Sequence, residues 1–191
     1  MEDSLPSPDE SCGKHFRYRD LIEVGETWRV HRIDNRPREI ATYDAMRAIC
    51  AKVLDPVQDK FGRVELTYAF SSPELDKLVH LDPAPNAYRR GDQHAGCELD
   101  IKGKPFCTRL GLAVDFTCPG VSSAEVAKWV AQNTEFDRLY FYDGDRSFHV
   151  SVGPDNKRQI ALMAKLPSGF LVPRRISPTY FDEVLSQART D

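Results

Sequence analysis

The sequence lacks long hydrophobic runs, and no apolar stretch approaches the roughly 18 residues that a membrane-spanning helix requires. Residues 1–13 are acidic and rich in serine and proline, without the basic segment and apolar core of a secretory signal. We therefore predict a disordered acidic N-terminus over residues 1–13, a cytoplasmic location and no membrane partner.

Cysteines are few and odd in number. The five are Cys12, Cys50, Cys97, Cys107 and Cys118. They form no Cys-x-x-Cys unit, which argues against a disulfide framework and is typical of a reducing environment. Cys97 and Cys107 flank a predicted hairpin, so a bridge or an accessory metal site between them remains an open alternative.

An excess of basic charge is also missing. The formal net charge is −3 and the pI is near 6.0, so no overall positive field favours nucleic acid or an anionic membrane as a partner. The chain has 191 residues, 41% of them hydrophobic and 29% charged, which suits one soluble globular domain with its own core. The pair Arg174 and Arg175 is typical of solvated surface. The sequence gives no indication of oligomeric state.

Hydrophobic periodicity predicts both helices and strands. Apolar residues recur at every third or fourth position over residues 40–61, which indicates a long core helix. Pro56 is expected to kink or divide this helix, and Gly62 to end it. Alternating residues predict strands over 64–70, 136–142, 147–152 and 159–163. Further helical segments are expected over 73–79, from 122 onward and over 180–188. We predict an α+β fold, with helices packed on a small antiparallel sheet.

Two histidines and an aspartate on or beside predicted strands form a candidate metal site. His94 follows a proline-rich loop, Asp115 lies in the run Leu112-Ala113-Val114-Asp115-Phe116, and His149 lies within the strand 147–152. Two imidazoles and a carboxylate can supply three ligands to Zn²⁺ and leave a fourth position for water or substrate. That arrangement is typical of catalytic rather than structural zinc.

The phrases around these residues resemble the zinc D-alanyl-D-alanine carboxypeptidase and murein endopeptidase family, which has the Hedgehog/DD-peptidase fold. Asp92-Gln93-His94 is similar to the family's Ser-x-His, residues 111–116 to its Gly-x-Ala-x-Asp-Phe, and Phe148-His149-Val150 to its closing histidine phrase. The similarity covers about residues 15–164. It implies a domain over 14–164, a C-terminal extension over 165–191 with a short helix, and Zn²⁺ as the cofactor.

One departure from the family pattern concerns an arginine that helps to hold the substrate. The family's Ser-Gly-Tyr-Arg-Ser-Pro phrase places it at the end of the strand 64–70, where this chain has Ser71. A hydroxyl cannot replace the charge or the fork of donors of a guanidinium. Arg89, Arg90 and Arg109 are the cations that could compensate. The substrate-binding residues that we predict are Ser71 and Asp92.

A second departure is the distance along the chain from His94 to Asp115, which exceeds the family's spacing. We interpret the excess as an inserted hairpin at about 97–110, with Lys102-Gly103-Lys104-Pro105 as its turn. In a competing register Asp100 would be the ligand. We favour Asp115 because the residues that follow it lead into the family's next helix.

The resemblance also implies a general base shortly before the last histidine. Arg146 occupies the family's position, so we predict Asp145 for this role, with Asp143 as the alternative. The expected function is a zinc-dependent hydrolase that cleaves peptide bonds in cell-wall-type or D-amino-acid peptides, with a small peptide or muropeptide as substrate. Without a signal, release of the phage type would bring such a chain to the cell wall. The alternatives are a zinc protein of the same fold with another substrate, and a catalytically degenerate binding module.

Overall fold

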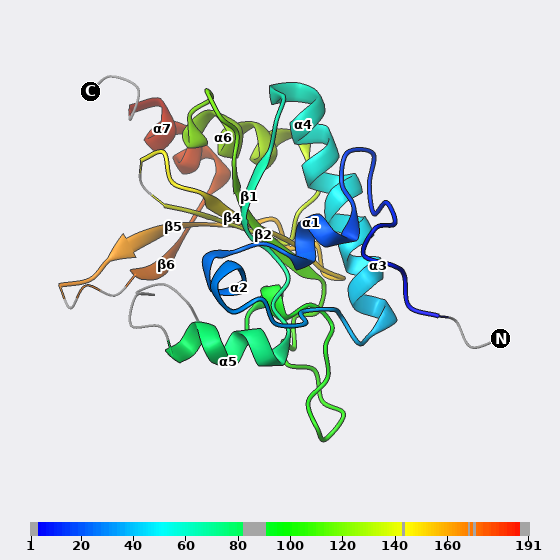
Figure 1. The fold of residues 1–191 in the computed structure, drawn as a ribbon. Coiled ribbons are helices and arrows are strands. Elements are labelled where there is room, and N and C mark those ends of the chain that lie inside the picture. Colours follow the sequence, from blue (N-terminus) through cyan, green and yellow to red (C-terminus); the bar gives the residue numbers. More distant parts are fainter. Residues whose placement is uncertain (1–3, 82–90, 143, 168, 170, 188–191) are drawn as a thin grey trace.

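The chain forms a six-stranded β-sheet with helices on both sides (Figure 1). The computed structural model describes residues 4–81, 91–142, 144–167, 169 and 171–187. The strands are β1 (Glu65–Tyr68), β2 (Leu112–Thr117), β3 (Arg138–Phe141), β4 (Phe148–Val152), β5 (Gln159–Lys165) and β6 (Leu171–Ile176). The helices are α1 (Tyr18–Ile22), α2 (Glu26–His31), α3 (Ile40–Ile49), η1 (Cys50–Leu54), α4 (Asp55–Phe61), α5 (Pro73–Leu81), η2 (Gln93–Ala95), α6 (Ser123–Asn133) and α7 (Pro178–Gln187).

The sheet is mixed, with the order β1-β2-β4-β3-β5-β6. This confirms the α+β class and corrects the prediction of a small antiparallel sheet, because β3 and β5 are parallel while the other neighbouring pairs are antiparallel. β4 returns beside β3 as a hairpin. Residues 153–158 then carry the chain to the other side of β3, so β5 starts at the same end of the sheet as β3.

The predicted core helix over residues 40–61 is present in three consecutive parts, α3, the π-helical η1 and α4. Pro56 lies in the first turn of α4. It has no N–H to donate to the carbonyl of Lys52, and its ring would crowd that carbonyl in a regular α-helix. The wider π-helical turn lies directly before Pro56, so the helix is divided there.

The two faces of the sheet differ in chemistry because side chains alternate along a strand. Val114, Phe116 and Val150 point to one face and are fully buried in the hydrophobic core. Helices α3 and α6 pack on the strands there, and Figure 1 shows α6 and α7 on one side of the sheet with α5 on the other. Asp115 and His149 alternate with these residues and so occupy the second face.

Both ends of the described chain contribute buried residues. Cys12, within the segment expected to be disordered, is buried, and its Sγ lies 3.4 Å from that of Cys50. In the predicted C-terminal extension, β6 pairs with β5, and the short helix is α7. Phe181 and Leu185 of α7 are buried in the core.

The predicted insertion over residues 97–110 is a loop that reverses direction, drawn in green at the bottom of Figure 1. Leu99 and Pro105 form an isolated β-bridge in it, instead of the two strands expected. Its base is fixed by the buried Glu98, whose carboxylate accepts a hydrogen bond of 2.8 Å from the hydroxyl of Thr42 in α3. The loop is therefore anchored on the core helix.

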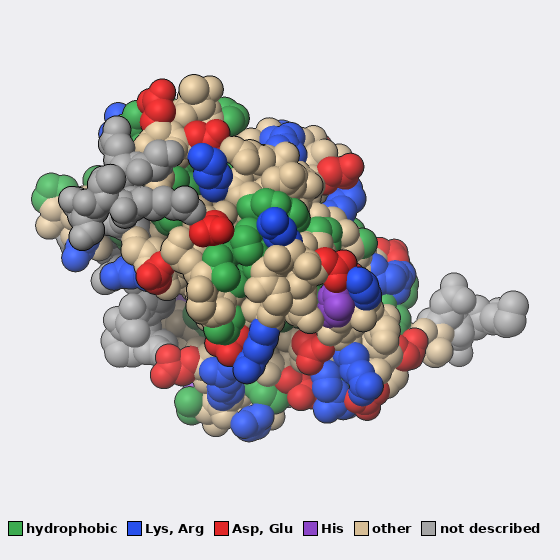
Figure 2. Space-filling view, turned by 90° about the horizontal axis from the view of Figure 1, so that it is seen from above, with side chains coloured by type: hydrophobic (Ala, Val, Ile, Leu, Met, Phe, Trp, Pro, Cys, Tyr) green, Lys and Arg blue, Asp and Glu red, His purple; other side chains and the backbone are tan. Residues whose placement is uncertain are grey.

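Acidic and basic side chains are interspersed on the face of the molecule shown in Figure 2, without a large region of one sign. None of the helices among the described residues combines the length and the apolar character needed to cross a bilayer.

Candidate metal centre

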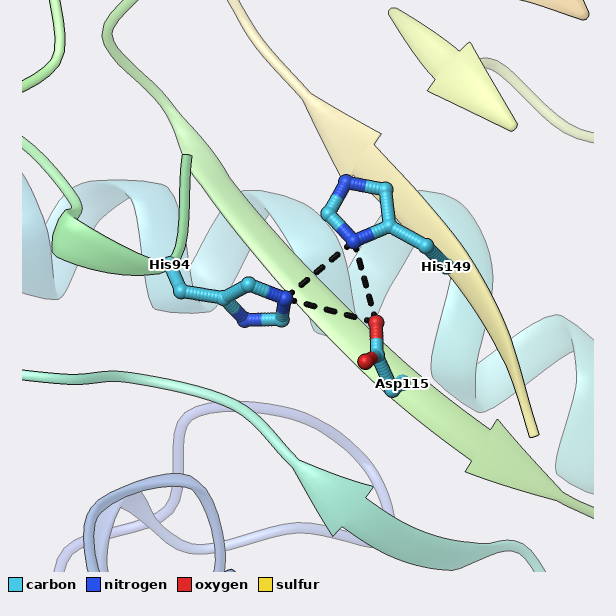
Figure 3. Close-up of side chains that lie close together, drawn as sticks. All are labelled: His94, Asp115 and His149. Atoms are coloured by element: carbon cyan, nitrogen blue, oxygen red, sulfur yellow. Dashed lines mark hydrogen bonds and ion pairs between the residues drawn. The ribbon is translucent and has the colours of Figure 1, made fainter. Parts of the chain in front are cut away.

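Asp115 and His149 lie side by side on the polar face of the sheet. They are directly opposite each other in the antiparallel register of β2 and β4. His94 belongs to η2, a short 3-10 turn, and its imidazole points to the same place (Figure 3). Three residues that are far apart in the sequence thus meet, and they are the three that the sequence predicted.

The donor atoms of the three side chains are close enough to share one ion. Nδ1 of His149 lies 3.0 Å from Oδ1 of Asp115, and Nε2 of His94 lies 3.1 Å from Nδ1 of His149 and 3.3 Å from Oδ1 of Asp115. Ligands of a tetrahedral zinc ion at ordinary bond lengths are about 3.3 Å apart. The triad therefore fits one face of such a tetrahedron after shifts of a few tenths of an ångström.

Backbone contacts fix His94 in the orientation that a metal ligand needs. Its Nδ1 lies 2.8 Å from the carbonyl oxygen of Ala69, an acceptor, so this nitrogen carries the proton and donates it. Nε2 is left to face Asp115 and His149. A hydrogen bond of this kind to the far nitrogen is what holds the ligating histidine in most metal sites.

Two of the predicted residues adjoin His94 through its backbone. The carboxylate of Asp92 accepts the N–H of His94 at 2.9 Å, which caps η2. The N–H of Ser71 donates to the carbonyl of His94, also at 2.9 Å. Ser71 is fully buried, and its Oγ has no hydrogen-bond partner among the described residues. Their roles in binding substrate stay predictions.

Aromatic rings stand on both sides of the triad along one row of the sheet. Tyr68 is paired with Asp115 in the register, and Tyr140 with His149. The ring of Tyr140 stacks on His149 with centroids 5.0 Å apart, and that of Tyr68 is tilted against His94 at 4.6 Å. These rings help to exclude water, and the side chains of His94 and His149 are only 3% and 7% exposed.

The site strongly perturbs the ionisation of its own residues. Burial alone would lower the pKa of His94, but the carboxylates of Asp92 and Asp115 raise it to about 9. Burial alone would raise the pKa of the Asp115 carboxyl, but the two histidines hold it well below its usual range. In the metal-free chain at neutral pH, a cationic His94 therefore stands beside an anionic Asp115.

Tyr142 follows β3 and lies on the same face as Tyr140, two residues earlier. Burial raises the pKa of its phenol, and the carboxylates of Asp115 and Asp92 raise it further. The phenol therefore stays protonated at neutral pH and can donate a hydrogen bond near the triad.

The predicted general base lies outside the triad. Asp145 is exposed, and its Oδ1 accepts the N–H of Ser123 at the start of α6, at 3.3 Å. The alternative, Asp143, lies outside the described residues, as do the two arginines Arg89 and Arg90. Arg109 is half-buried. A catalytic role for any of these residues stays a prediction.

The other residues that the sequence offered as metal ligands, Asp100 and the pair Cys97 and Cys107, lie outside the triad. Asp100 lies in the turn of the insertion, where its Oδ1 accepts the N–H groups of Lys102 and Lys104 at 2.8 and 2.9 Å. Cys97 and Cys107 are free thiols. Among the described residues, the group of His, Cys, Asp and Glu side chains placed to hold a metal is the triad.

Sequence reasoning missed two features of the site. The first is Gln93, which is the variable position of the phrase Asp92-Gln93-His94 and whose side chain is fully buried. The second feature is Tyr140, which lies within the predicted strand over residues 136–142. The strand alternation predicted for 136–142 would have placed it on the face of His149, but only the cross-strand register shows that the two rings meet.

No protein-family model, no curated protein and no solved structure matches this chain.

Proposed function

We propose that this chain is a zinc-dependent hydrolase, with His94, Asp115 and His149 as the ligands. The observation that carries the proposal is the convergence of two imidazole nitrogens and one carboxylate oxygen within 3.3 Å of each other. The side chains of His94 and His149 are 3% and 7% exposed, whereas that of Asp115 is 22% exposed. An ion held there would have protein on one side and an approach for substrate on the other.

The donor set does not by itself select the metal. Two histidines and one carboxylate also hold non-haem iron(II), with ligands about 3.0 Å apart on one face of an octahedron. The resemblance of the three motifs to the zinc peptidase family favours zinc. The same resemblance supports peptides of the cell-wall type, or peptides containing D-amino acids, as the substrates.

Zinc in this position would polarise a carbonyl group and make water a stronger acid. The chain itself must then move a proton from the attacking water to the leaving amine, and Asp145 is the carboxylate that we assign to this role. The neutral phenol of Tyr142 is suited to donate a hydrogen bond to the oxygen of the substrate carbonyl. The carboxylate of Asp92 accepts the backbone N–H of His94 and so helps to keep this histidine in place.

The experiment is elemental analysis of the purified protein together with a peptide assay. We expect about one zinc ion per chain in the wild type, lost on His94→Ala and on His149→Ala. Hydrolysis of D-Ala-D-Ala and L-Ala-D-Glu peptides should stop on treatment with a chelator and return with zinc. A full complement of metal in both variants would refute the proposal, and iron in place of zinc would refute its chemistry.

The buried Ser71 keeps a second function open. Without a guanidinium at this position, a zinc protein of similar fold could act on a different substrate. Stoichiometric zinc with no turnover of either peptide would favour this alternative.

A further inference from the structure

Gln93 is the residue of the site that no motif identifies. It is fully buried and immediately precedes His94 in η2. Buried side-chain amides must find hydrogen-bond partners, because an unpaired one loses its hydration without return. The hydrogen-bond partners of the Gln93 amide lie on other elements of the site.

The amide of Gln93 contacts both of the segments that carry the other two ligands. Its Oε1 accepts the hydroxyl of Ser151 at 2.9 Å, and Ser151 lies two residues after His149 on β4. Its Nε2 donates to the carbonyl of Leu110 at 2.9 Å, just before β2, which carries Asp115. Weaker contacts of Nε2 reach the Asp137 carboxylate at 3.3 Å and the Val152 carbonyl at 3.4 Å.

These partners allow only one orientation of the amide. The carbonyls of Leu110 and Val152 can only accept hydrogen bonds, so they require the NH₂ end, while the Ser151 hydroxyl supplies a donor to the oxygen. A single side chain thus connects η2, the entrance to β2 and the strand β4.

We propose that Gln93 is a positioning residue, which holds His94 at the separation from Asp115 and His149 that one metal ion requires. The inference deepens the proposed function and rests on it. β2 and β4 are joined by sheet hydrogen bonds, so Asp115 and His149 are already in register. His94 lies outside the sheet, on a turn of three residues. The contact to the Ala69 carbonyl fixes the orientation of its imidazole, and the Gln93 amide connects this turn to β4 and to the segment that leads into β2.

The test compares Gln93→Met and Ser151→Ala with a matched control. Gln93→Met keeps the size of the side chain and removes its hydrogen bonds, and Ser151→Ala removes only the hydroxyl. The control is Thr134→Val, which also loses one buried hydroxyl, bonded to Val130 at 2.8 Å at the end of α6. The measurements are Zn²⁺ affinity, by competition with a chromophoric chelator, and the visible spectrum of the Co²⁺-loaded protein.

We expect zinc affinity about 10- to 100-fold weaker in Gln93→Met, which is the usual effect of removing a group that orients a metal ligand. Ser151→Ala should show a smaller loss in the same direction, and its cobalt bands should shift, while Thr134→Val should match the wild type in both. Wild-type affinity and cobalt spectra in Gln93→Met and Ser151→Ala would overturn the proposal. If Gln93→Met does not fold, Ser151→Ala decides on the same criteria.

Amide hydrogen exchange of the metal-free protein separates this inference from the proposed function. Loss of the Gln93 contacts should speed exchange in η2 relative to β4, which Thr134→Val should not do. A wild type that binds no metal would refute the proposed function, and exchange would still decide the role of Gln93. Exchange in η2 of Gln93→Met equal to that of the wild type would then overturn it.

Discussion

Oδ1 of Asp115 lies 3.0 Å from Nδ1 of His149 on the neighbouring strand. Asp100, the aspartate of the competing register, instead caps a turn through the N–H of Lys102 and of Lys104. We therefore predict that Asp115→Ala abolishes zinc binding, with a loss larger than the about 10- to 100-fold expected for residues that only orient a ligand. Asp100→Ala should retain zinc.

Zinc content after dialysis, with circular dichroism to check folding, measures this difference. Asp100→Ala is the matched control, because it removes a carboxylate of the same size from an exposed turn. Loss of zinc from Asp100→Ala but not from Asp115→Ala would show that the register is wrong.

The triad could be found from sequence because each of its members lies in a short phrase that resembles a motif of the zinc peptidase family. Asp115 and His149 each alternate with core residues such as Val114 and Val150, so the face on which they lie followed from strand periodicity. The parallel pairing of β3 with β5 could not be found in this way. Strand neighbours in a sheet depend on contacts between distant segments. No local signal in the sequence shows that the chain after β4 crosses to the edge of β3 opposite β4, where β5 lies.

The pKa of His94 predicts how pH affects metal binding. In the metal-free protein it is raised to about 9, so His94 is protonated at neutral pH and a metal must displace that proton. Apparent zinc affinity should therefore rise about tenfold for each pH unit from neutrality to about 9, and level off above it. Titrations at several pH values, with calorimetry in buffers of different ionisation enthalpy, measure the protons released.

Stability of the metal-free protein should depend on pH in the opposite sense. A histidine pKa that folding raises contributes stability that is complete below the unfolded value of about 6.5. This contribution is lost as the pH rises through about 9. Asp92→Asn tests the cause, because the charge of Asp92 is the largest single contribution that raises the pKa of His94. In this variant the rise in zinc affinity should level off at lower pH, and the stability should be lost at lower pH. Zinc affinity that does not change between neutrality and pH 9 would contradict this account.

Gly111 is the glycine of the phrase over residues 111–116 that contains Asp115. Its surroundings explain why a glycine is needed at this position. Its φ is +78°, and a Cβ there would lie 1.9 Å from the carbonyl oxygen of Val152. Gly103, in the insertion, has a similar φ of +72°, and none of the described residues lies within 4 Å of an added Cβ. We predict that Gly103→Ala costs about 1–2 kcal/mol, from backbone conformation alone.

Gly111→Ala should cost clearly more, because it adds a collision with backbone to the same conformational strain. It should also weaken zinc binding, since Gly111 directly precedes the strand that carries Asp115. Denaturant unfolding of the two variants measures the difference. Equal losses of unfolding free energy would show that β2 and β4 adapt around position 111.

The role of Ser71 can be tested against its neighbour. Both Ser71 and Ser72 are buried, but only the Oγ of Ser72 has a clear task, since it accepts the N–H of Leu75 at 3.2 Å at the start of α5. Ser72→Ala should lose this cap, at a cost of about 1 kcal/mol in unfolding free energy. Ser71→Ala removes a hydroxyl without a partner among the described residues, so stability should stay the same or rise.

Peptide hydrolysis by the same two variants then separates structure from function. If Ser71 meets the substrate, as its place in the motif implies, Ser71→Ala should lose activity while its melting temperature is unchanged. If its part is the backbone contact to His94, which alanine retains, activity should also be unchanged. Ser71→Arg should be unstable and inactive in either case, because a guanidinium at a fully buried position would need a charge partner there. High activity in a stable Ser71→Arg protein would contradict the buried environment that the structure gives this residue.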